Sequence, residues 1–207
     1  MTLAEARNLL DILVDKANNP YFINNEKDEF LSLAITEFIN KYYSVNDLSE
    51  QARAALKGVT VVEQQTSTSS IVVLPDDFMY LLSLGIQYNH PTQSYGSARL
   101  KKYALAKQVS PAQFRFQTDP FNKPTKENPL FTYVSGSSGT TIHILPNIDL
   151  QKKYAYYIKR PDLADVFTAL NPEIEESYQH EIVQIAARKM AANIESSNYE
   201  VQSQEAE

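Results

Sequence analysis

Two adjacent carboxylates are the residues that most suggest catalysis in this chain. Asp76 and Asp77 follow Leu74 and Pro75 and precede Phe78. A glycosidase needs two acids that flank a sugar bond, but the side chains of adjacent residues usually point apart. An aspartate after Leu-Pro is also typical of a short turn whose free amides it caps. We therefore interpret the segment as a structural hinge, with an aspartate as its cap and Phe78 as its core anchor. A small hydrolase that uses both aspartates is an alternative.

Other site chemistries find little support in the sequence. No Lys-Ser or Lys-Thr pair follows a glycine-rich loop, so the usual phosphate cradle is missing. The three histidines, His90, His143 and His180, lie far apart, and there is no cysteine to join them in a spaced ligand motif. The sequence therefore predicts no catalytic residue, no cofactor and no metal site, and we do not expect an enzyme.

The tyrosines are the other conspicuous group, with 13 in the chain. Three of them share one expected strand, in which alternation places Tyr154 and Tyr156 on one face and Tyr157 on the other. Aromatic residues beside lysines suit sugars or single-stranded nucleic acid, and tyrosine is also enriched in protein interfaces. We favour a core-and-interface role. The residues we expect to bind a partner are Tyr154, Tyr156 and Tyr157, and, near the C-terminus, Glu195, Tyr199, Glu200 and Val201.

Composition indicates a globular chain of ordinary apolar content. The 207 residues are 43% hydrophobic and 21% charged, enough to bury one good core. The net charge is −6, and residues 171–207 hold eight acidic residues against two basic ones. An acidic chain is a poor general binder of nucleic acid. No apolar run approaches the length of a membrane span, and the start lacks a signal-peptide pattern. We expect a soluble protein made in the cytosol.

Amphipathic spacing predicts helices at both ends of the chain. Thr2 and Glu5 form a capping box at the start of the first helix, and two further helices follow up to Gly58. Near the C-terminus, Asn171 is the expected cap of a long helix with Pro172 at its first position. This helix should extend to residue 195 and pack on the N-terminal helices. A flexible polar tail is expected at 196–207.

The middle of the chain has the two-residue periodicity of strands. Strands at 59–62 and 70–74 are expected to pair as a hairpin, with a mobile loop at 66–70 as the alternative. A strand at 80–88 with one buried face follows. The segment 90–128 is rich in turns, with a short strand at 99–105. Strands at 131–134, 141–145 and 153–158 are expected to be antiparallel neighbours in succession. The expected fold is α+β, with a helical layer and a central, mostly antiparallel β region, divided into 1–58, 59–170, 171–195 and 196–207.

Short motifs along this layout resemble one known family. These are Leu74-Pro75-Asp76-Asp77-Phe78, Ile142-His143-Ile144-Leu145-Pro146, and the segment from Tyr154 to Pro161 that leads into the last helix. The chain resembles the head–tail connector (adaptor, or tail-tubular) proteins of tailed bacteriophages. Its opening Leu9-Leu10-Asp11 and Asn19-Pro20-Tyr21-Phe22 are similar to ring proteins of crAss-like short-tailed gut phages.

The resemblance implies a structural virion protein at the portal vertex, made in the host bacterial cytoplasm. It implies a ring of about twelve copies that connects the portal protein to other tail or ring proteins. Double-stranded DNA would pass through its channel without specific binding. On this basis we expect acidic residues 173–207 near the channel and the β region facing tail components. The alternative is a carbohydrate- or receptor-binding module of a phage tail, built on the tyrosine-rich strands.

Overall fold

The chain folds into two compact units, each with its own set of elements. The computed structural model describes residues 1–14, 22–46, 49–95, 98–115, 123–136 and 139–205; within these, side chains at 90–102, 115, 136, 139 and 195–205 are not described. The helical unit comprises Met1–Val59 and Arg160–Glu207, and the β unit comprises Thr60–Lys159. The predicted α+β class with a mostly antiparallel β region is confirmed.

Six elements form the helical unit. They are α1 (Leu3–Val14), α2 (Asn24–Tyr43), α3 (Glu50–Leu56), the 3₁₀ turn η1 (Lys57–Val59), α5 (Leu163–Val166) and α6 (Glu176–Glu205). The β unit contains β1 (Thr60–Thr66), β2 (Ile71–Val73), β3 (Phe78–Tyr95), β4 (Ala98–Leu105), β5 (Lys107–Gln108), α4 (Pro111–Arg115), β6 (Leu130–Gly136), β7 (Gly139–Leu145) and β8 (Leu150–Lys159). Its contiguous sequence makes the β unit an insertion in the helical unit.

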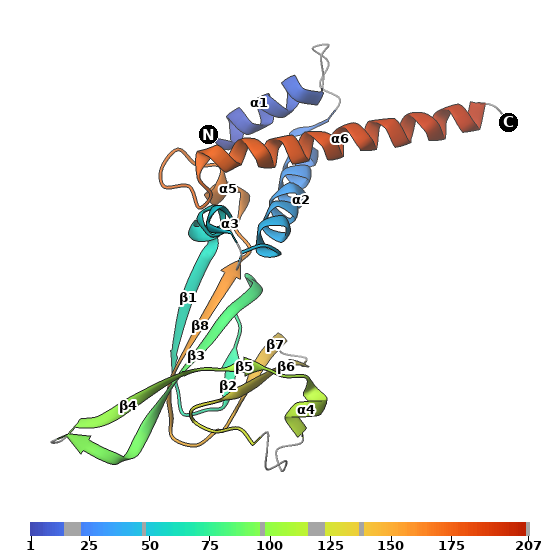
Figure 1. The fold of residues 1–207 in the computed structure, drawn as a ribbon. Helices are drawn as coiled ribbons and strands as arrows, with labels where there is room; N and C mark the ends of the chain where they lie inside the picture. The colour runs from blue at the N-terminus through green and yellow to red at the C-terminus, as the bar shows by residue number, and fades with distance from the viewer. Residues whose placement is uncertain (15–21, 47–48, 96–97, 116–122, 137–138, 206–207) are drawn as a thin grey trace. The chain divides into compact units, whose positions relative to one another are not determined.

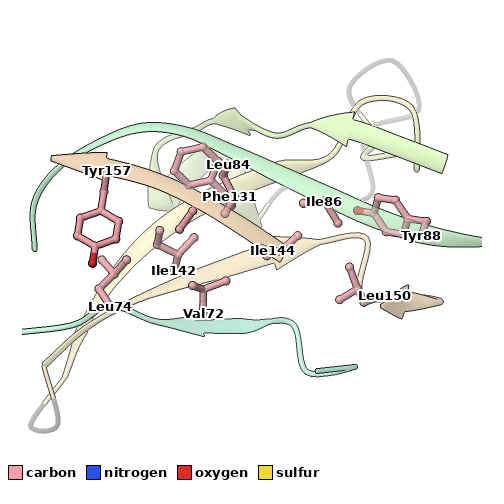
Figure 2. Packing of buried hydrophobic residues seen from close by; sticks show 11 residues of the cluster. Val72, Leu74, Leu84, Ile86, Tyr88, Phe131, Ile142, Ile144, Leu150 and Tyr157 are labelled. Carbon is pink, nitrogen blue, oxygen red and sulfur yellow. The ribbon is translucent and has the colours of Figure 1, made fainter. Parts of the chain in front are cut away.

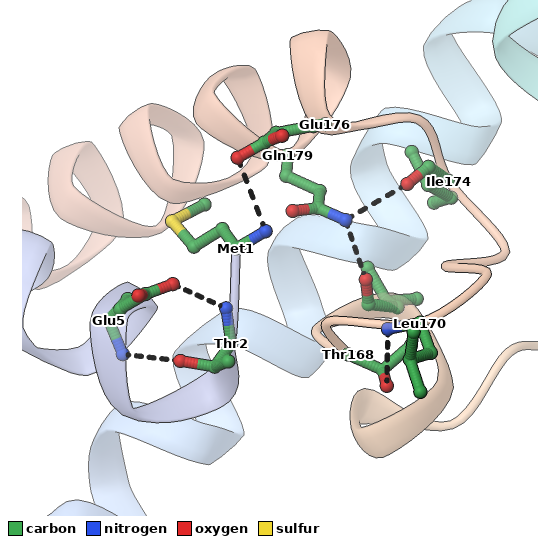
Figure 3. Close-up of polar contacts among 9 residues, drawn as sticks. Met1, Thr2, Glu5, Thr168, Leu170, Ile174, Glu176 and Gln179 are labelled. Atoms are coloured by element: carbon green, nitrogen blue, oxygen red, sulfur yellow. Dashed lines mark hydrogen bonds and ion pairs between the residues drawn. The ribbon is translucent and has the colours of Figure 1, made fainter.

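The first helix begins as its sequence pattern predicts. The Thr2 amide donates to Glu5 Oε2 at 2.7 Å and the Glu5 amide to Thr2 Oγ1 at 3.3 Å, which completes the predicted capping box (Figure 3). The pKa of Glu5 is lowered, chiefly because its carboxylate accepts from the Thr2 backbone. The predicted end of this helix at Asn18, Asn19 and Pro20 lies outside the described residues.

The helix α2 is buried on a broad face against α6. Its fully or nearly buried apolar residues are Leu31, Ala34, Ile35, Phe38, Ile39 and Tyr42. At its C-terminal end, the Tyr42 hydroxyl donates to Glu181 Oε2 at 2.8 Å, and Lys41 Nζ lies 2.6 Å from Glu181 Oε1. Burial raises the pKa of Glu181, but the hydrogen bonds from Lys41 and Tyr42 outweigh burial and hold this pKa below its usual value.

The long C-terminal helix begins later than its cap signals predict. Asn171 has a φ of 51°, in the left-handed region, and α6 begins at Glu176. The intervening loop buries Ile174 completely, and the Ile174 and Val166 carbonyls accept hydrogen bonds from Gln179 Nε2 at 3.0 and 2.8 Å (Figure 3). Burial of the loop therefore replaces the expected first turn of helix at Asn171 and Pro172.

The end of α6 also differs from the expectation. The helix continues to Glu205, beyond the expected end at residue 195. Figure 1 shows this part of α6 extending beyond α1 and α2. Residues 160–170 were predicted to belong to the β region. In the structure they belong to the helical unit, where Pro161, Val166 and Phe167 are buried. The β unit accordingly ends at Lys159 rather than at residue 170.

The β unit is a pair of four-stranded sheets. Sheet A has the strand order β1-β8-β3-β4 and is antiparallel; sheet B has the order β2-β7-β6-β5, in which only β5 and β6 pair in parallel. The first and last strands of the unit are neighbours, since Thr60 pairs with Ile158. The chain therefore enters and leaves the β unit at adjacent positions.

Two predicted strand pairings are wrong. The strands β1 and β2 do not form a hairpin, because β1 pairs with β8 and β2 with β7. Likewise β7 and β8, though consecutive, belong to different sheets. The predicted hairpin of β6 and β7 is confirmed. In the turn-rich segment the strand at 99–105 is present as β4, but β3 continues to Tyr95, farther than predicted.

The core of the β unit lies between the two sheets. Eleven buried residues from both sheets form one apolar cluster (Figure 2). They are Val72, Leu74, Leu84, Ile86, Tyr88, Phe131, Ile142, Ile144, Leu150, Ala155 and Tyr157. The expected one-sided burial of the strand at 80–88 is visible in Leu84, Ile86 and Tyr88, although Gln87 is also buried.

A lysine is buried on the inner side of β8. Lys153 is 1% exposed and shares its strand phase with Ala155 and Tyr157. Its Nζ donates to the Ser69 and Ile71 carbonyls at 2.6 and 3.0 Å. This side chain therefore ties β8 of sheet A to the start of β2 in sheet B. Burial lowers the pKa of Lys153 below its usual 10.5, because desolvation disfavours the charged ammonium.

We expect the Lys153→Met variant to change how stability depends on pH. Between the lowered folded pKa and the unfolded value of 10.5, the unfolded chain binds the lysine proton more tightly than the folded chain does. The Lys153 contribution to the free energy of unfolding therefore rises with pH through this window. The stability of wild type relative to Lys153→Met should increase from pH 7 toward pH 10.5 in urea titrations. Lys152→Met is the charge-matched control, and an equal trend for that control would contradict the assignment.

A tyrosine-lined groove as a candidate binding surface

The outward face of sheet A carries the candidate site. Strand alternation in β8 turns Tyr154 and Tyr156 away from the core and Tyr157 into it, as predicted: Tyr157 is buried and its ring centroid lies 5.7 Å from that of Phe78. Burial, followed by the charges of Asp77 and Glu63, raises the pKa of Tyr157. Tyr157 is therefore a core residue, and only Tyr154 and Tyr156 remain available to a partner.

A groove lies between β8, β3 and β4 on this face. It has a volume of about 280 Å³ and is lined mainly by Gly85, Tyr103, Leu105, Tyr154 and Tyr156. The strand register builds it, since Gly85 pairs with Tyr154 on one side and with Leu105 on the other. Because Gly85 has no side chain, its position forms the floor between the flanking residues.

Glycine is not required by the backbone at this floor. A Cβ added at Gly85 would lie 3.6 Å from Tyr154 Cβ and 3.8 Å from the Tyr154 carbonyl oxygen, which are ordinary van der Waals contacts. Glycine leaves open a space that a larger side chain would fill. A substitution at Gly85 can therefore close the groove without a backbone clash.

Tyrosine rings line both sides of the groove, with Tyr154 on β8 and Tyr103 on β4. The centroids of Tyr103 and Tyr154 are 6.3 Å apart at an interplanar angle of 41°, within the range of favourable aromatic pairs. Burial, followed by the neighbouring Tyr103, raises the pKa of Tyr154. The Tyr154 phenol is therefore protonated at neutral pH, and the wall presents uncharged rings and hydroxyls.

The face around the groove is apolar and exposed. Tyr103 is 63% and Leu105 71% exposed, and Val62, which pairs with Tyr156, is also exposed. At the described outward positions that share this register, Lys152 is the one charged residue. Depletion of charge around exposed aromatic residues is characteristic of the centre of a protein interface.

A buried amide lies next to the groove in the sheet register. Gln87 pairs with Lys152 and with Tyr103, is 1% exposed, and has neither amide atom in a hydrogen bond. The sequence did not indicate this residue, because a glutamine between apolar strand residues is normally solvent-facing. An unpaired buried amide costs about 1–3 kcal/mol, so it marks a weak point in the sheet.

We expect Gln87→Met to keep or raise the stability of the β unit. Methionine has a similar length and needs no hydrogen-bond partner, so the variant should gain up to about 1 kcal/mol in the free energy of unfolding. Urea titration measures the change. Gln64→Met on β1, which pairs with β8 rather than with β3, is the control, because Gln64 Nε2 already donates to Thr66 Oγ1. A loss of more than about 1 kcal/mol in Gln87→Met would mean that the amide is satisfied in solution.

The predicted hinge forms a turn, but its aspartate cap is wrong. The Phe78 amide donates to the Pro75 carbonyl at 3.1 Å, Leu74 is buried in the core, and Phe78 is partly buried against it. Asp77 Oδ1, however, is buried without a hydrogen-bond partner, and Asp76 is exposed. Burial of the flanking apolar residues, rather than capping, therefore holds the turn.

The remaining predicted residues do not gather at a site. Glu195, Tyr199, Glu200 and Val201 lie within the bounds of α6, but their side chains are outside the described ones. His143 is on β7 and His180 on α6, in different units, and the side chain of His90 is not described. Among the described residues no three histidines or carboxylates are grouped so as to hold a metal ion.

Comparison with known proteins adds no relative. No protein-family model matches the chain, and no curated protein matches its sequence. None of the helices described is both long and apolar enough to cross a bilayer. Inferences about function therefore rest on the surfaces of the two units and on the short sequence motifs quoted above.

Proposed function

We propose that this chain is a structural subunit of an oligomeric ring. The observation that carries the proposal is the exposed, charge-depleted apolar face of sheet A around Tyr103 and Leu105. Exposed apolar patches of this kind mark contact surfaces. The helical unit supports the same conclusion, because Ile12 on α1, Leu33 on α2 and Ile23 just before α2 are also exposed.

We further propose that the ring is a head–tail connector of a tailed bacteriophage, at the portal vertex of the virion. The short motifs quoted above support this placement, and the extended α6 gives the helical unit an arm for contact with a portal or tail protein. The acidic residues that follow Asn171 suit a DNA channel, since like charge keeps DNA from adhering to the wall. In this role the protein binds copies of itself and performs no catalysis.

Sedimentation velocity and electron microscopy test the proposal directly. The purified chain should form closed rings, alone or on addition of the portal protein of the same phage. A chain that stays monomeric at every concentration and does not bind that portal would contradict it. The adjacent ends of the β unit allow a sharper variant, in which a short linker joins Val59 to Arg160. If the β unit contacts tail components, this variant should bind the portal but fail to recruit the tail.

The groove favours a second candidate, a carbohydrate- or receptor-binding module. Tyr103, Tyr154 and Tyr156 could stack on the apolar face of a sugar ring, and the volume of about 280 Å³ suits a small saccharide unit. A glycan array separates the candidates. Saccharide binding that Gly85→Leu abolishes would favour this function, whereas the connector predicts no binding on the array.

A further inference from the structure

Positive charge is concentrated in one continuous segment of the β unit. Thr60–Lys159 holds ten basic and six acidic residues, whereas the rest of the chain holds nine basic and nineteen acidic ones. Residues 78–118, which include β3, β4, β5 and α4, contain no aspartate or glutamate. Their charged residues are Arg99, Lys101, Lys102, Lys107 and Arg115. A protein with a net charge of −6 therefore contains a long segment whose formal charges are all positive.

The topology places three of these basic residues on a two-stranded ribbon. The pairing of β3 with β8 ends at Tyr88, and beyond this residue β3 pairs with β4 alone in the described part of the chain. The register sets Arg99, Lys101 and Lys102 opposite Ser94, Asn89 and Tyr88. Figure 1 shows β3 and β4 extending together beyond β1 and β8. We call residues 88–95 and 98–102 the basic ribbon.

The charges at the base of the basic ribbon do not cancel its own. Lys152 on β8 pairs with Gln87, the residue that precedes the ribbon. Asp149 also lies beside the base, since its carbonyl accepts a hydrogen bond from the Asn89 amide at 2.9 Å. Its carboxylate, however, lies 2.6 Å from Lys126 Nζ. The ion pair neutralises this acid, so the electrostatic potential at this end of sheet A is positive.

Protection of a free sheet edge does not account for this charge. Lysine on an edge strand such as β4 prevents pairing with other sheets. That role needs charge at the edge only, whereas acidic residues are also missing from the inner strand β3 and from the rest of 78–118. Charged residues are depleted at the centre of protein interfaces. A cluster of cations without acids therefore favours a polyanion over a protein as the partner.

A two-stranded ribbon also has suitable dimensions for duplex DNA. The major groove of B-DNA is about 12 Å wide and admits such a ribbon. Arg99 and Lys101 are two positions apart on β4, about 7 Å along the strand, so each can reach a different phosphate. Serine, threonine and glutamine also bind phosphate oxygens, and the segment 92–94 of β3 contains one of each.

We propose that the basic ribbon binds the phosphate backbone of double-stranded DNA without recognition of its sequence. Arg99, Lys101 and Lys102 each neutralise a phosphate, and Lys152 adds to the field that attracts the duplex. Phosphate contacts of this kind allow a protein and DNA to slide along one another, so they are compatible with passage of DNA. The contact goes beyond the ring proposed above, since a single copy of the chain suffices for it.

Fluorescence anisotropy with a labelled DNA duplex tests the contact. Three phosphate contacts predict a slope of about −2.7 for log affinity against log salt, which is a loss of roughly 40-fold between 50 and 200 mM salt. The variant Arg99→Gln/Lys101→Gln/Lys102→Gln should bind at least tenfold more weakly at 50 mM salt. Lys101→Gln alone should reduce the steepness of the slope by about 1. Unchanged affinity in the triple variant would overturn the proposal.

The charge-matched control is Arg53→Gln/Lys57→Gln/Arg188→Gln. These three residues are exposed and lie in the helical unit, so the control has the same net charge as the ribbon variant. Its affinity for DNA should stay within about threefold of wild type and its salt slope should not change. An equal loss in both variants would attribute binding to net charge and overturn the proposal. Circular dichroism melts establish that both variants fold.

Three further outcomes decide the partner. A wild-type chain without affinity for the duplex at 50 mM salt would overturn the proposal. Poly-glutamate that displaces the duplex at matched charge would indicate a general anion-binding surface and also overturn it. A ribbon variant that binds DNA normally but self-associates more weakly would assign the ribbon to an acidic protein surface instead. Failure of the wild-type chain to form rings would overturn the proposed function alone, because DNA binding is measured independently of the oligomer.

Discussion

The Gly58→Ala variant should lose about 3 kcal/mol or more of the free energy of unfolding of the helical unit. A Cβ at this position would lie 1.7 Å from the Glu173 carbonyl oxygen and 2.7 Å from its carbonyl carbon. Both contacts are with backbone, so no side-chain rotation relieves them. The loop before α6 would have to move, and with it the completely buried Ile174. Urea denaturation followed by helical circular dichroism measures the loss.

Gly85→Ala is the matched control for this variant. Its Cβ meets Tyr154 at ordinary distances of 3.6 Å and above, and alanine is favoured over glycine in a strand interior by about 0.5–1 kcal/mol. We therefore expect Gly85→Ala to be neutral or slightly stabilising. A Gly58→Ala protein as stable as wild type would show that the loop does not approach η1 as closely as the structure places it.

The Phe38→Ala variant should lose about 3–5 kcal/mol, the range for truncation of a buried aromatic residue. Phe38 is fully buried on α2, with ring centroids 4.6 Å from Tyr42 and 5.9 Å from Tyr178 of α6. Truncation leaves a cavity at the centre of this aromatic group and removes contacts between α2 and α6. Thermal and urea melts of the purified variants should both show the loss.

Leu33→Ala on the same helix separates folding from assembly. Leu33 is 57% exposed, so its truncation should change the free energy of unfolding by less than about 0.5 kcal/mol. If the helical unit contributes to a ring contact, Leu33→Ala should still weaken self-association. A large loss of stability in Leu33→Ala, or none in Phe38→Ala, would contradict the packing of α2.

The helices of the N-terminal segment could be predicted because their signals are local. Thr2 and Glu5 are three residues apart and satisfy one another's amides within one turn. The apolar residues of α2 recur at helical spacing whatever they pack against. Local signals gave the wrong start for the last helix, which they placed at Asn171 and Pro172. In the structure this segment is a loop instead, held by the burial of Ile174 and the hydrogen bonds of Gln179.

The strands could be located from the sequence, but most of their partners could not. Alternation in β8 correctly placed Tyr154 and Tyr156 opposite Tyr157. Pairing depends on competition between segments far apart in the chain, and β8 pairs with both β1 and β3 in place of its predicted neighbour β7. A short loop favours a hairpin only when no distant strand offers a longer ladder.

The groove is the clearest case of a feature decided by tertiary structure. Its tyrosine wall on β8 follows from two-residue periodicity alone. Its floor and far wall come from Gly85 and from Tyr103 and Leu105, which meet Tyr154 through a register that includes bulges in β3. One inserted residue in a strand reverses which side chains face outward.

The sequence by itself determined the α+β class, the presence of helices at both ends of the chain, and the position of most strands. It also determined that Tyr154 and Tyr156 face outward. These features depend on the spacing of neighbouring residues. Only the tertiary structure decided that two sheets enclose the core, that α6 begins at Glu176, and that Gly85 lies between Tyr154 and Leu105. Those features depend on the burial of apolar surface between segments that are distant in the chain. The spacing of neighbouring residues does not determine which distant segments pack together.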